Sequence, residues 1–152
     1  MWKKTMKNLL FLPALMVFIS LQAQDPVQWS FSAKKIADKT YELYMTANVE
    51  SPWSIYSQQT PDGGPLPTSF SFSKNPLVNL VGNVKEKGSI KKKFEEVFEV
   101  DVLYYKDKVE FVQVIKLKNN IKTNINGTLE YMACNDEQCL PPREVPFSVS
   151  IQ

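Results

Sequence analysis

The sequence predicts an all-β protein, an immunoglobulin-like β-sandwich of about eight or nine strands with a two-cysteine loop near the C-terminal end. Two observations lead to this fold class. Apolar and polar residues alternate along short runs, which is typical of strands with one buried face. Residues that favour turns separate these runs, and no stretch has the period of an amphipathic helix.

In the first half of the chain, the alternation predicts strands that are separated by turn-rich segments. Val27, Trp29 and Phe31 alternate with polar residues and begin the series. Residues 33–39 are expected to form a turn, and residues 60–67 form a loop rich in Pro and Gly. The strands predicted here cover residues 27–31, 41–49, 53–56, 68–73 and 77–84.

The second half contains the longest β-forming stretch. Residues 97–105 are predicted to form one strand, with Phe98, Val100, Val102 and Tyr104 on the same face. Residues 109–117 are apolar on both faces, as expected for a central strand. Residues 106–108 and 124–127 have turn chemistry, and strands are predicted again at 128–133 and 145–151.

Composition limits the chemistry that this chain can perform. The 152 residues suffice for one domain with a real core. The sequence has no histidine, which excludes Ser-His-Asp and Cys-His catalysis. Two cysteines without histidine also make a poor zinc site, so no metal is expected.

The N-terminus is predicted to be a signal peptide covering residues 1–23, with the domain covering residues 24–152. Three lysines precede an apolar run at 9–21 that is short for a permanent membrane anchor, which is the alternative. Cleavage is expected after Ala23. The mature chain would then be exported into a compartment where disulfides form.

Charge argues against a nucleic-acid partner. Removal of residues 1–23 lowers the formal net charge from +2 to −1, because three lysines and no acids are lost. Nucleic-acid binding requires a concentrated basic face. The one basic cluster, residues 91–93, is followed by Glu95 and Glu96 and is expected to be a solvated hairpin or loop.

Cys134 and Cys139 are the only cysteines, and they lie between a predicted strand and a double proline. In an exported protein, such a pair usually forms a structural disulfide. A ring this small, however, would stabilise the fold by only about 2 kcal/mol in the chain-entropy model. The alternative is a redox loop, whose disulfide opens and closes without unfolding the domain.

The residues around the cysteines suggest what kind of redox site this would be. Asp136 and Glu137 place negative charge beside the sulfur atoms, which would disfavour a thiolate. Such a pair fits a passive shuttle, which a partner's thiolate attacks and which later reduces another partner. Pro141 and Pro142 restrict the chain just after Cys139, or are simply part of a strand connection.

The segments Tyr131-Met132-Ala133-Cys134, Cys139-Leu140-Pro141-Pro142 and Val145-Pro146-Phe147 resemble the N-terminal periplasmic domain of the membrane reductase DsbD. The resemblance extends from about residue 27 to 151. It implies an immunoglobulin-like periplasmic domain, without cofactor and expected to be a monomer, whose redox-active pair corresponds to Cys134 and Cys139. It also implies electrons taken from a membrane-embedded reductase and passed to thioredoxin-like periplasmic proteins.

The resemblance also suggests neighbours for the cysteines. The family covers its cysteine pair with a cap loop, whose aromatic residue corresponds best to Phe98 and whose acidic residue corresponds to Glu96. Tyr56 resembles a family tyrosine beside the pair, and Tyr131 lies in the matching segment. Periodicity alone instead favours Phe98 as a core residue of the strand 97–105.

Two departures from the family bear on the expected function. Four residues separate the cysteines, whereas the best-known member has five. The sequence ends at Gln152 without transmembrane helices, so the electron donor is expected to be a separate polypeptide. By resemblance, Cys139 would be attacked by the partner and Cys134 would resolve the mixed disulfide.

Two functions from different classes follow. The first is a periplasmic thiol–disulfide exchange module, a component of a protein-disulfide reductase system. The second is an exported β-sandwich that binds a glycan or peptide through aromatics such as Trp53 and Tyr56, with a structural disulfide. A hydrolase has little support, because the acidic residues show no recognisable paired spacing.

Overall fold

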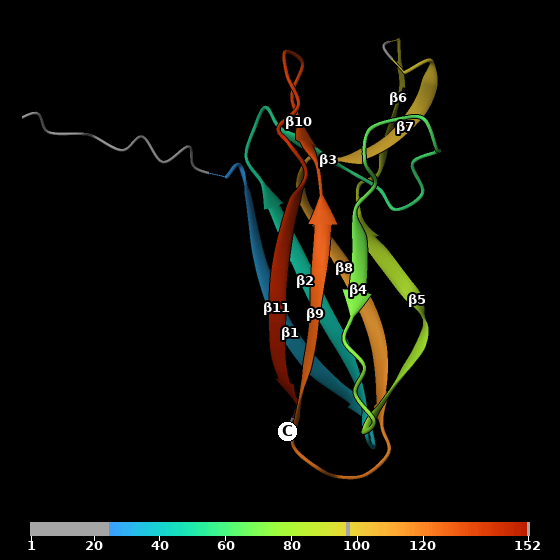
Figure 1. Ribbon diagram of the computed structural model, residues 1–152, viewed down its shortest axis with the longest axis vertical. Coiled ribbons are helices and arrows are strands. Elements are labelled where there is room, and N and C mark those ends of the chain that lie inside the picture. Colours follow the sequence, from blue (N-terminus) through green and yellow to red (C-terminus); the bar gives the residue numbers. More distant parts are fainter. Residues whose placement is uncertain (1–24, 97, 152) are drawn as a thin grey trace, which may run out of the picture.

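The computed structural model describes residues 25–96 and 98–151, and it is built of strands and loops (Figure 1). The expected signal peptide lies outside the described residues. Among the described residues, no helix has the length and hydrophobicity needed to cross a membrane. The eleven strands are β1 (Val27–Ala37), β2 (Thr40–Val49), β3 (Ser54–Tyr56), β4 (Ser69–Phe72), β5 (Val78–Gly88), β6 (Lys91–Glu95), β7 (Val100–Tyr105), β8 (Asp107–Leu117), β9 (Thr123–Tyr131), β10 (Ala133–Cys134) and β11 (Arg143–Ile151).

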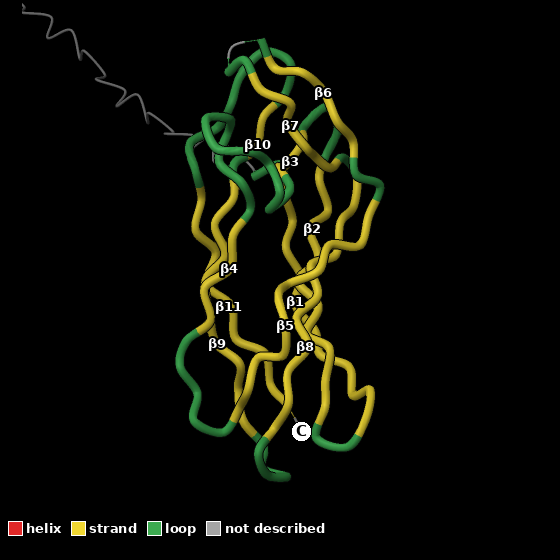
Figure 2. The backbone as a smooth tube through the Cα atoms, turned by 90° about the vertical axis from the view of Figure 1, so that its right-hand side faces the viewer, coloured by secondary structure: helices red, strands yellow, loops and turns green. Residues whose placement is uncertain are grey.

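The strands form two facing layers and a third small sheet. One layer has the order β1-β2-β8-β5 and the other the order β11-β9-β4 (Figure 2). The third sheet, β10-β3-β7-β6, lies at the end of the molecule that carries the cysteine loop. This arrangement agrees with the predicted all-β sandwich, and the count exceeds eight or nine because short strands such as β3 and β10 are separate elements.

The core lies between the two layers. Leu43, Met45 and Phe111 face it from one layer, and Leu129 and Phe147 face it from the other. Each of these positions alternates with a more exposed neighbour, as the period of a strand requires. Below the third sheet, the core is aromatic: the ring centroids of Phe70 and Phe111 are 4.9 Å apart.

The strands β1 and β5 are longer than the sequence predicts. β1 continues to Ala37, because residues predicted as a turn pair with β2, and only Asp38 and Lys39 form the turn. β5 continues past Gly82 to Gly88 through an irregularity between Val81 and Lys85. The buried amide of Gln113 donates hydrogen bonds to the Val81 and Gly82 carbonyls at 3.1 and 3.3 Å, so these backbone groups remain satisfied.

Residues 124–127 were predicted as a turn, and this prediction was wrong. They lie within β9, where Asn126 pairs with Ser148 and Gly127 pairs with Phe147. A Cβ atom on Gly127 would lie 2.5 Å from both the Phe147 ring and the Ser71 carbonyl oxygen. The glycine therefore marks a close approach within a sheet, not a reversal of the chain.

The predicted strand 97–105 was also wrong in its first half. β7 begins at Val100, and Phe98 and Glu99 belong to the turn that joins it to β6. Glu99 has a positive φ of 55°, which lies outside the extended conformation of a regular strand. The lysine cluster at 91–93 forms β6, where Lys91 pairs with Tyr104.

Candidate functional site

Cys134 and Cys139 form a disulfide at one end of the sandwich. Cys134 is the last residue of β10, which pairs with β3, and only 5% of its surface is exposed. Cys139 follows the loop and is exposed. The two sulfur-bearing residues therefore differ sharply in their access to solvent, although they are bonded to each other.

The loop between the cysteines is held by its own hydrogen bonds. The Asn135 side-chain oxygen accepts from the backbone nitrogens of Glu137 and Gln138 at 2.9 and 2.8 Å. The Asn135 backbone nitrogen donates to the Gln138 carbonyl at 2.9 Å. Such Asx turns form without help from distant residues. The loop conformation thus does not depend on the disulfide alone.

A second group of bonds secures the base of this loop. Tyr131 and Arg143 are paired in register at the ends of β9 and β11, and both contact Asp25. The Tyr131 hydroxyl donates to the Asp25 carboxylate at 2.5 Å, and the Arg143 guanidinium lies 3.0 Å from it. Burial, followed by the hydrogen bond to Asp25, raises the pKa of Tyr131 above its usual value. Tyr131 therefore stays protonated and supports the loop from below.

An open groove of about 370 Å³ lies beside the disulfide. One wall is the cysteine loop, the other is the hairpin of β6 and β7, and β3 contributes to the floor (Figure 1). The side chains that line it are Tyr56, Lys93, Glu95, Phe98, Cys134, Asn135, Asp136, Glu137, Gln138 and Cys139.

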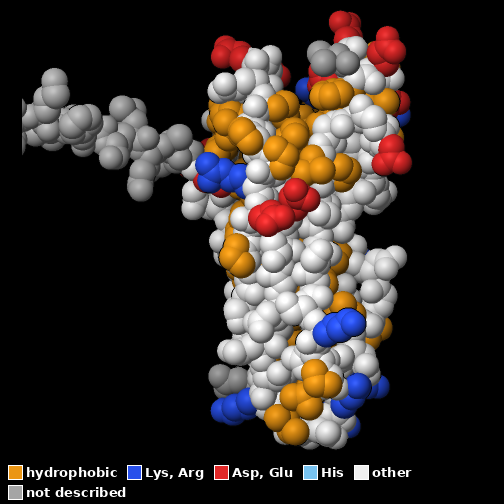
Figure 3. Space-filling model, viewed as in Figure 1, with side chains coloured by type: hydrophobic (Ala, Val, Ile, Leu, Met, Phe, Trp, Pro, Cys, Tyr) orange, Lys and Arg blue, Asp and Glu red, His pale blue; other side chains and the backbone are white. Residues whose placement is uncertain are grey.

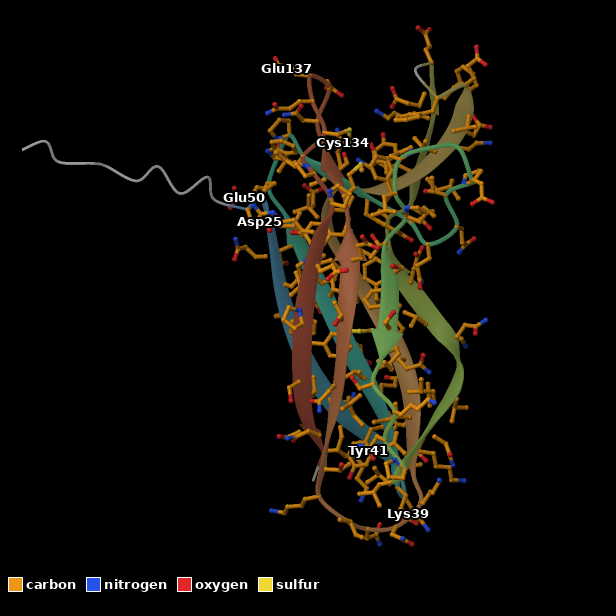
Figure 4. The ribbon with its side chains drawn as sticks, viewed as in Figure 1. Asp25, Lys39, Tyr41, Glu50, Cys134 and Glu137 are labelled. Carbon is orange, nitrogen blue, oxygen red and sulfur yellow. A yellow bond between two sulfur atoms is a disulfide. The ribbon has the colours of Figure 1, made fainter. Side chains whose placement is uncertain are left out.

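The groove brings together the two cysteines and four side chains that the sequence singled out with them or from the resemblance. Tyr56 is buried to 3% exposure, and burial, with a smaller effect of Glu95, raises its pKa to about 12. Phe98 lines the groove from the turn after β6 and is 38% exposed. Asp136 and Glu137 are exposed on the cysteine loop, and Glu137 lies at its tip in Figure 4. Cys139 lines the same groove.

Two of the singled-out residues do not line the groove. Tyr131 lies beneath it in the core, 5.4 Å from the Trp29 ring. Glu96 is exposed in the turn, and its neighbour Glu95 lines the groove instead. The Glu95 carboxylate pairs with the Lys93 ammonium at 2.8 Å. Lys93 and Glu95 could have been found from the period of a strand, had residues 91–95 been recognised as one.

The second candidate function has less support from this geometry. An aromatic side chain binds a glycan or peptide by presenting its ring to solvent. Tyr56 is almost fully buried, and Trp53 packs against the main core. Within the described part of the chain, no group of three or more His, Cys, Asp or Glu residues is arranged to hold a metal ion.

Comparison with known families identifies the domain. Residues 20–150 match the family described as the N-terminal domain of the thiol:disulfide interchange protein DsbD. The chain belongs to the DsbD N-terminal domain family. Membership of this family, together with the Cys134–Cys139 disulfide, supports a thiol–disulfide exchange module.

Solved structures of DsbD N-terminal domains share this fold. The reduced domain of Neisseria meningitidis DsbD is 14% identical, with 82% of this chain and 85% of that chain covered and a TM-score of 0.54. The same domain in complex with the PilB N-terminal domain is 14% identical, with coverages of 84% and 87% and a TM-score of 0.51.

A domain from a differently named protein is also similar. The N-terminal periplasmic domain of ScsB from Proteus mirabilis is 16% identical, with a TM-score of 0.58. The match covers 88% of this chain and 49% of that chain. Among curated proteins, no sequence matches. At these identities, the solved structures establish the fold alone.

Proposed function

We propose that the protein is an exported, periplasmic module that relays reducing equivalents between a separate membrane-embedded reductase and thioredoxin-like proteins. The carrier is the Cys134–Cys139 pair, which alternates between disulfide and dithiol. The observation that carries the proposal is the exposure of Cys139 in an open groove, while its bonded partner Cys134 is buried.

This difference in exposure suggests the order of steps. A reduced partner's thiolate attacks the Cys139 sulfur, breaks the disulfide and releases Cys134, which takes up a proton. The partner's second thiol then attacks its own sulfur in the mixed disulfide and releases Cys139. The partner leaves oxidised, and this protein holds two thiols.

The second half of the cycle transfers these two electrons onward. The Cys139 thiolate attacks the disulfide of an oxidised partner and forms a new mixed disulfide. Cys134 then attacks the Cys139 sulfur, restores the Cys134–Cys139 bond and releases the partner as a dithiol. Cys134 is thus the resolving residue, a role that suits a buried position next to Cys139.

Opening the bond is compatible with an intact fold. The base of the loop remains tied by the Leu140 nitrogen to the Ala133 carbonyl at 2.9 Å, and by Asp25 to Tyr131. Nine register pairs of β9 and β11 continue below it. A similar domain from Neisseria meningitidis has been solved in its reduced form.

The names of similar proteins support the location and partners. The ScsB domain is a periplasmic domain, and the Neisseria meningitidis DsbD domain forms a complex with the N-terminal domain of PilB. On this basis we propose that the module works in the periplasm after cleavage near Ala23, as a monomer that meets one partner at a time in the groove.

A trapping experiment tests the assignment. The oxidised protein is mixed with a reduced thioredoxin variant that lacks its resolving cysteine, and the covalent complex is digested and mapped by mass spectrometry. We expect a mixed disulfide at Cys139, and we expect none with a Cys134→Ser/Cys139→Ser control. A link at Cys134 would reverse the order of steps. A native disulfide that resists thioredoxin and dithiothreitol alike would exclude the exchange function.

A further inference from the structure

The end of the sandwich opposite the cysteine loop differs from the rest of the surface. We call it the basal end and define it by three turns, residues 38–39, 73–77 and 118–122. Figures 1 and 2 show these turns at the lower tip of the molecule, with Lys39 labelled there in Figure 4. The groove of the exchange site lies at the other tip.

Hydrogen bonds join the three turns into one surface. The Leu117 nitrogen donates to the Lys39 carbonyl at 2.7 Å, and the Lys118 nitrogen donates to the Leu77 carbonyl at 2.9 Å. The Asn75 amide donates to the Thr123 hydroxyl and to the Asn124 carbonyl, both at 3.0 Å. The backbones of these turns therefore have fixed positions relative to one another.

The basal end concentrates unpaired positive charge. Its exposed lysines are Lys74, Lys118 and Lys122 on the turns and Lys116 on β8. Asp38 is the one carboxylate in the described residues of these turns. The ion pairs of the described chain instead involve Lys87, Lys92, Lys93, Lys108 and Arg143. Among the described residues, none of the four basal lysines forms an ion pair with a carboxylate.

Apolar surface lies among these charges. A groove of about 460 Å³ is lined by Phe72, Pro76, Val78, Leu80 and Ile125, with Lys74 also in its lining. Leu80 and Ile121 are about half exposed. Figure 3 shows hydrophobic side chains at this tip with Lys and Arg side chains around them, whereas acidic side chains gather at the opposite tip.

We propose that the basal end is a docking surface for an anionic phospholipid bilayer. Lipid phosphates would neutralise the free lysines, while half-exposed aliphatic side chains would enter the region below the head groups. A purely acidic polypeptide would pair with the lysines but would leave Leu80 and Ile121 exposed to water. Docking in this way holds the module at the membrane that contains its proposed reductase and leaves the exchange groove free at the opposite end.

Vesicle binding tests this surface. The protein is isolated after export, its N-terminus is read by mass spectrometry, and it is sedimented with phosphatidylcholine vesicles that contain or lack phosphatidylglycerol. We expect binding only to the anionic vesicles, and weaker binding as salt increases. Lys118→Gln/Lys122→Gln should weaken binding about 25-fold, since each lysine near an anionic surface contributes about fivefold.

Matched variants separate this site from a general effect of charge. Lys91→Gln/Lys92→Gln removes the same charge from the cysteine end. Because this end is remote from the bilayer, vesicle binding should stay within about twofold of that of the unmodified protein. Ile121→Ser should weaken binding to anionic vesicles without changing its salt dependence. The rate of disulfide reduction by dithiothreitol should be unchanged in the basal-end variants, which shows that the fold and the exchange site are intact.

Three results would overturn the proposal. The first is no binding to anionic vesicles, and the second is equal weakening by the two lysine pairs. The third is retention on immobilised polyglutamate without binding to vesicles, which would assign the basal end to an acidic polypeptide. None of these results would affect the exchange function, because the trapping experiment tests that function separately.

Discussion

The two walls of the exchange groove are built differently. The cysteine loop is closed by a covalent bond, by hydrogen bonds of Asn135 and by the contacts of Asp25 at its base. At the tip of the β6–β7 hairpin, the described residues outside the strand ladder show one backbone hydrogen bond, from the Phe98 nitrogen to the Glu95 carbonyl at 3.1 Å. Its ion pairs are on the surface, where such pairs contribute little to stability.

The base of the hairpin, unlike its tip, is held by buried side chains and a side-chain hydrogen bond. Tyr105 is buried and donates a hydrogen bond to the Glu86 carboxylate at 2.7 Å, and Val102 is fully buried. Nearer the tip, Phe94 is 60% exposed. We therefore expect access to the disulfide to change by movement of the hairpin tip, while the cysteine loop keeps its geometry.

The largest effect is expected from a change that weakens the support of the cysteine loop. Gly127→Ala would place a Cβ against the Phe147 ring and the Ser71 carbonyl, so β4 and β9 must separate. We expect the free energy of unfolding to fall by about 3 kcal/mol, measured by denaturant titration. Ser148→Ala, at an exposed position of β11, should change it by less than about 0.5 kcal/mol. Equal stability of the two variants would disprove the close approach.

A smaller loss is expected from Tyr131→Phe, which removes the hydroxyl that binds Asp25. A hydrogen bond to a charged group is typically worth about 2 kcal/mol, so the free energy of unfolding should fall by that amount. Tyr104→Phe on the hairpin wall is the matched control, because the Tyr104 hydroxyl has no hydrogen bond among the described residues, and its effect should be near zero. The reverse order of effects would contradict the comparison of the two walls.

The Tyr131 contact also predicts the sign of a pH dependence. Because its pKa is raised in the folded state, the folded protein keeps a proton that the unfolded chain loses above about pH 10. The contribution of Tyr131 is therefore complete below about pH 10 and is lost as pH rises through the folded-state pKa. Denaturant titrations at increasing pH should show a shallower alkaline decline for Tyr131→Phe than for the unmodified protein.

The smallest effect on stability is expected at the hairpin tip. Phe98→Ala should change the free energy of unfolding by less than about 0.5 kcal/mol, because the side chain is largely outside the core. It should nevertheless speed reduction of the disulfide by dithiothreitol several-fold, since Phe98 lines the groove beside Cys139. Phe94→Ala removes the same side chain from a position that does not line the groove. Identical reduction rates for the two variants would show that Phe98 does not limit access.

Alternation predicted the regular part of the fold well. The strand expected at 41–49 is β2 (Thr40–Val49), and the one expected at 145–151 lies within β11 (Arg143–Ile151). Both have one face in the core, so side-chain polarity reports directly on burial. Composition near 124–127 was misleading for a physical reason: pairing with β11 outweighs the local turn preference of Asn and Gly.

The site was only partly predictable. The cysteine pair is evident from the sequence, and its disulfide is present. Phe98 was ambiguous, because alternation and family resemblance gave opposite answers, and the left-handed conformation of Glu99 that ends the alternation is not visible in composition. The role of Asp25 was not predicted, because its contacts with Tyr131 and Arg143 join residues more than a hundred positions apart in the sequence.

The position of Asp25 has a practical consequence for handling the protein. Its carboxylate is fixed at the base of the cysteine loop, so a purification tag attached just before it would emerge at the end of the molecule that carries the exchange groove (Figure 4). Ile151 ends β11 at the far tip, where a tag would leave the groove clear but would shield the lysines. The purification tag should therefore be at the C-terminus for redox assays and at the N-terminus for lipid-binding assays.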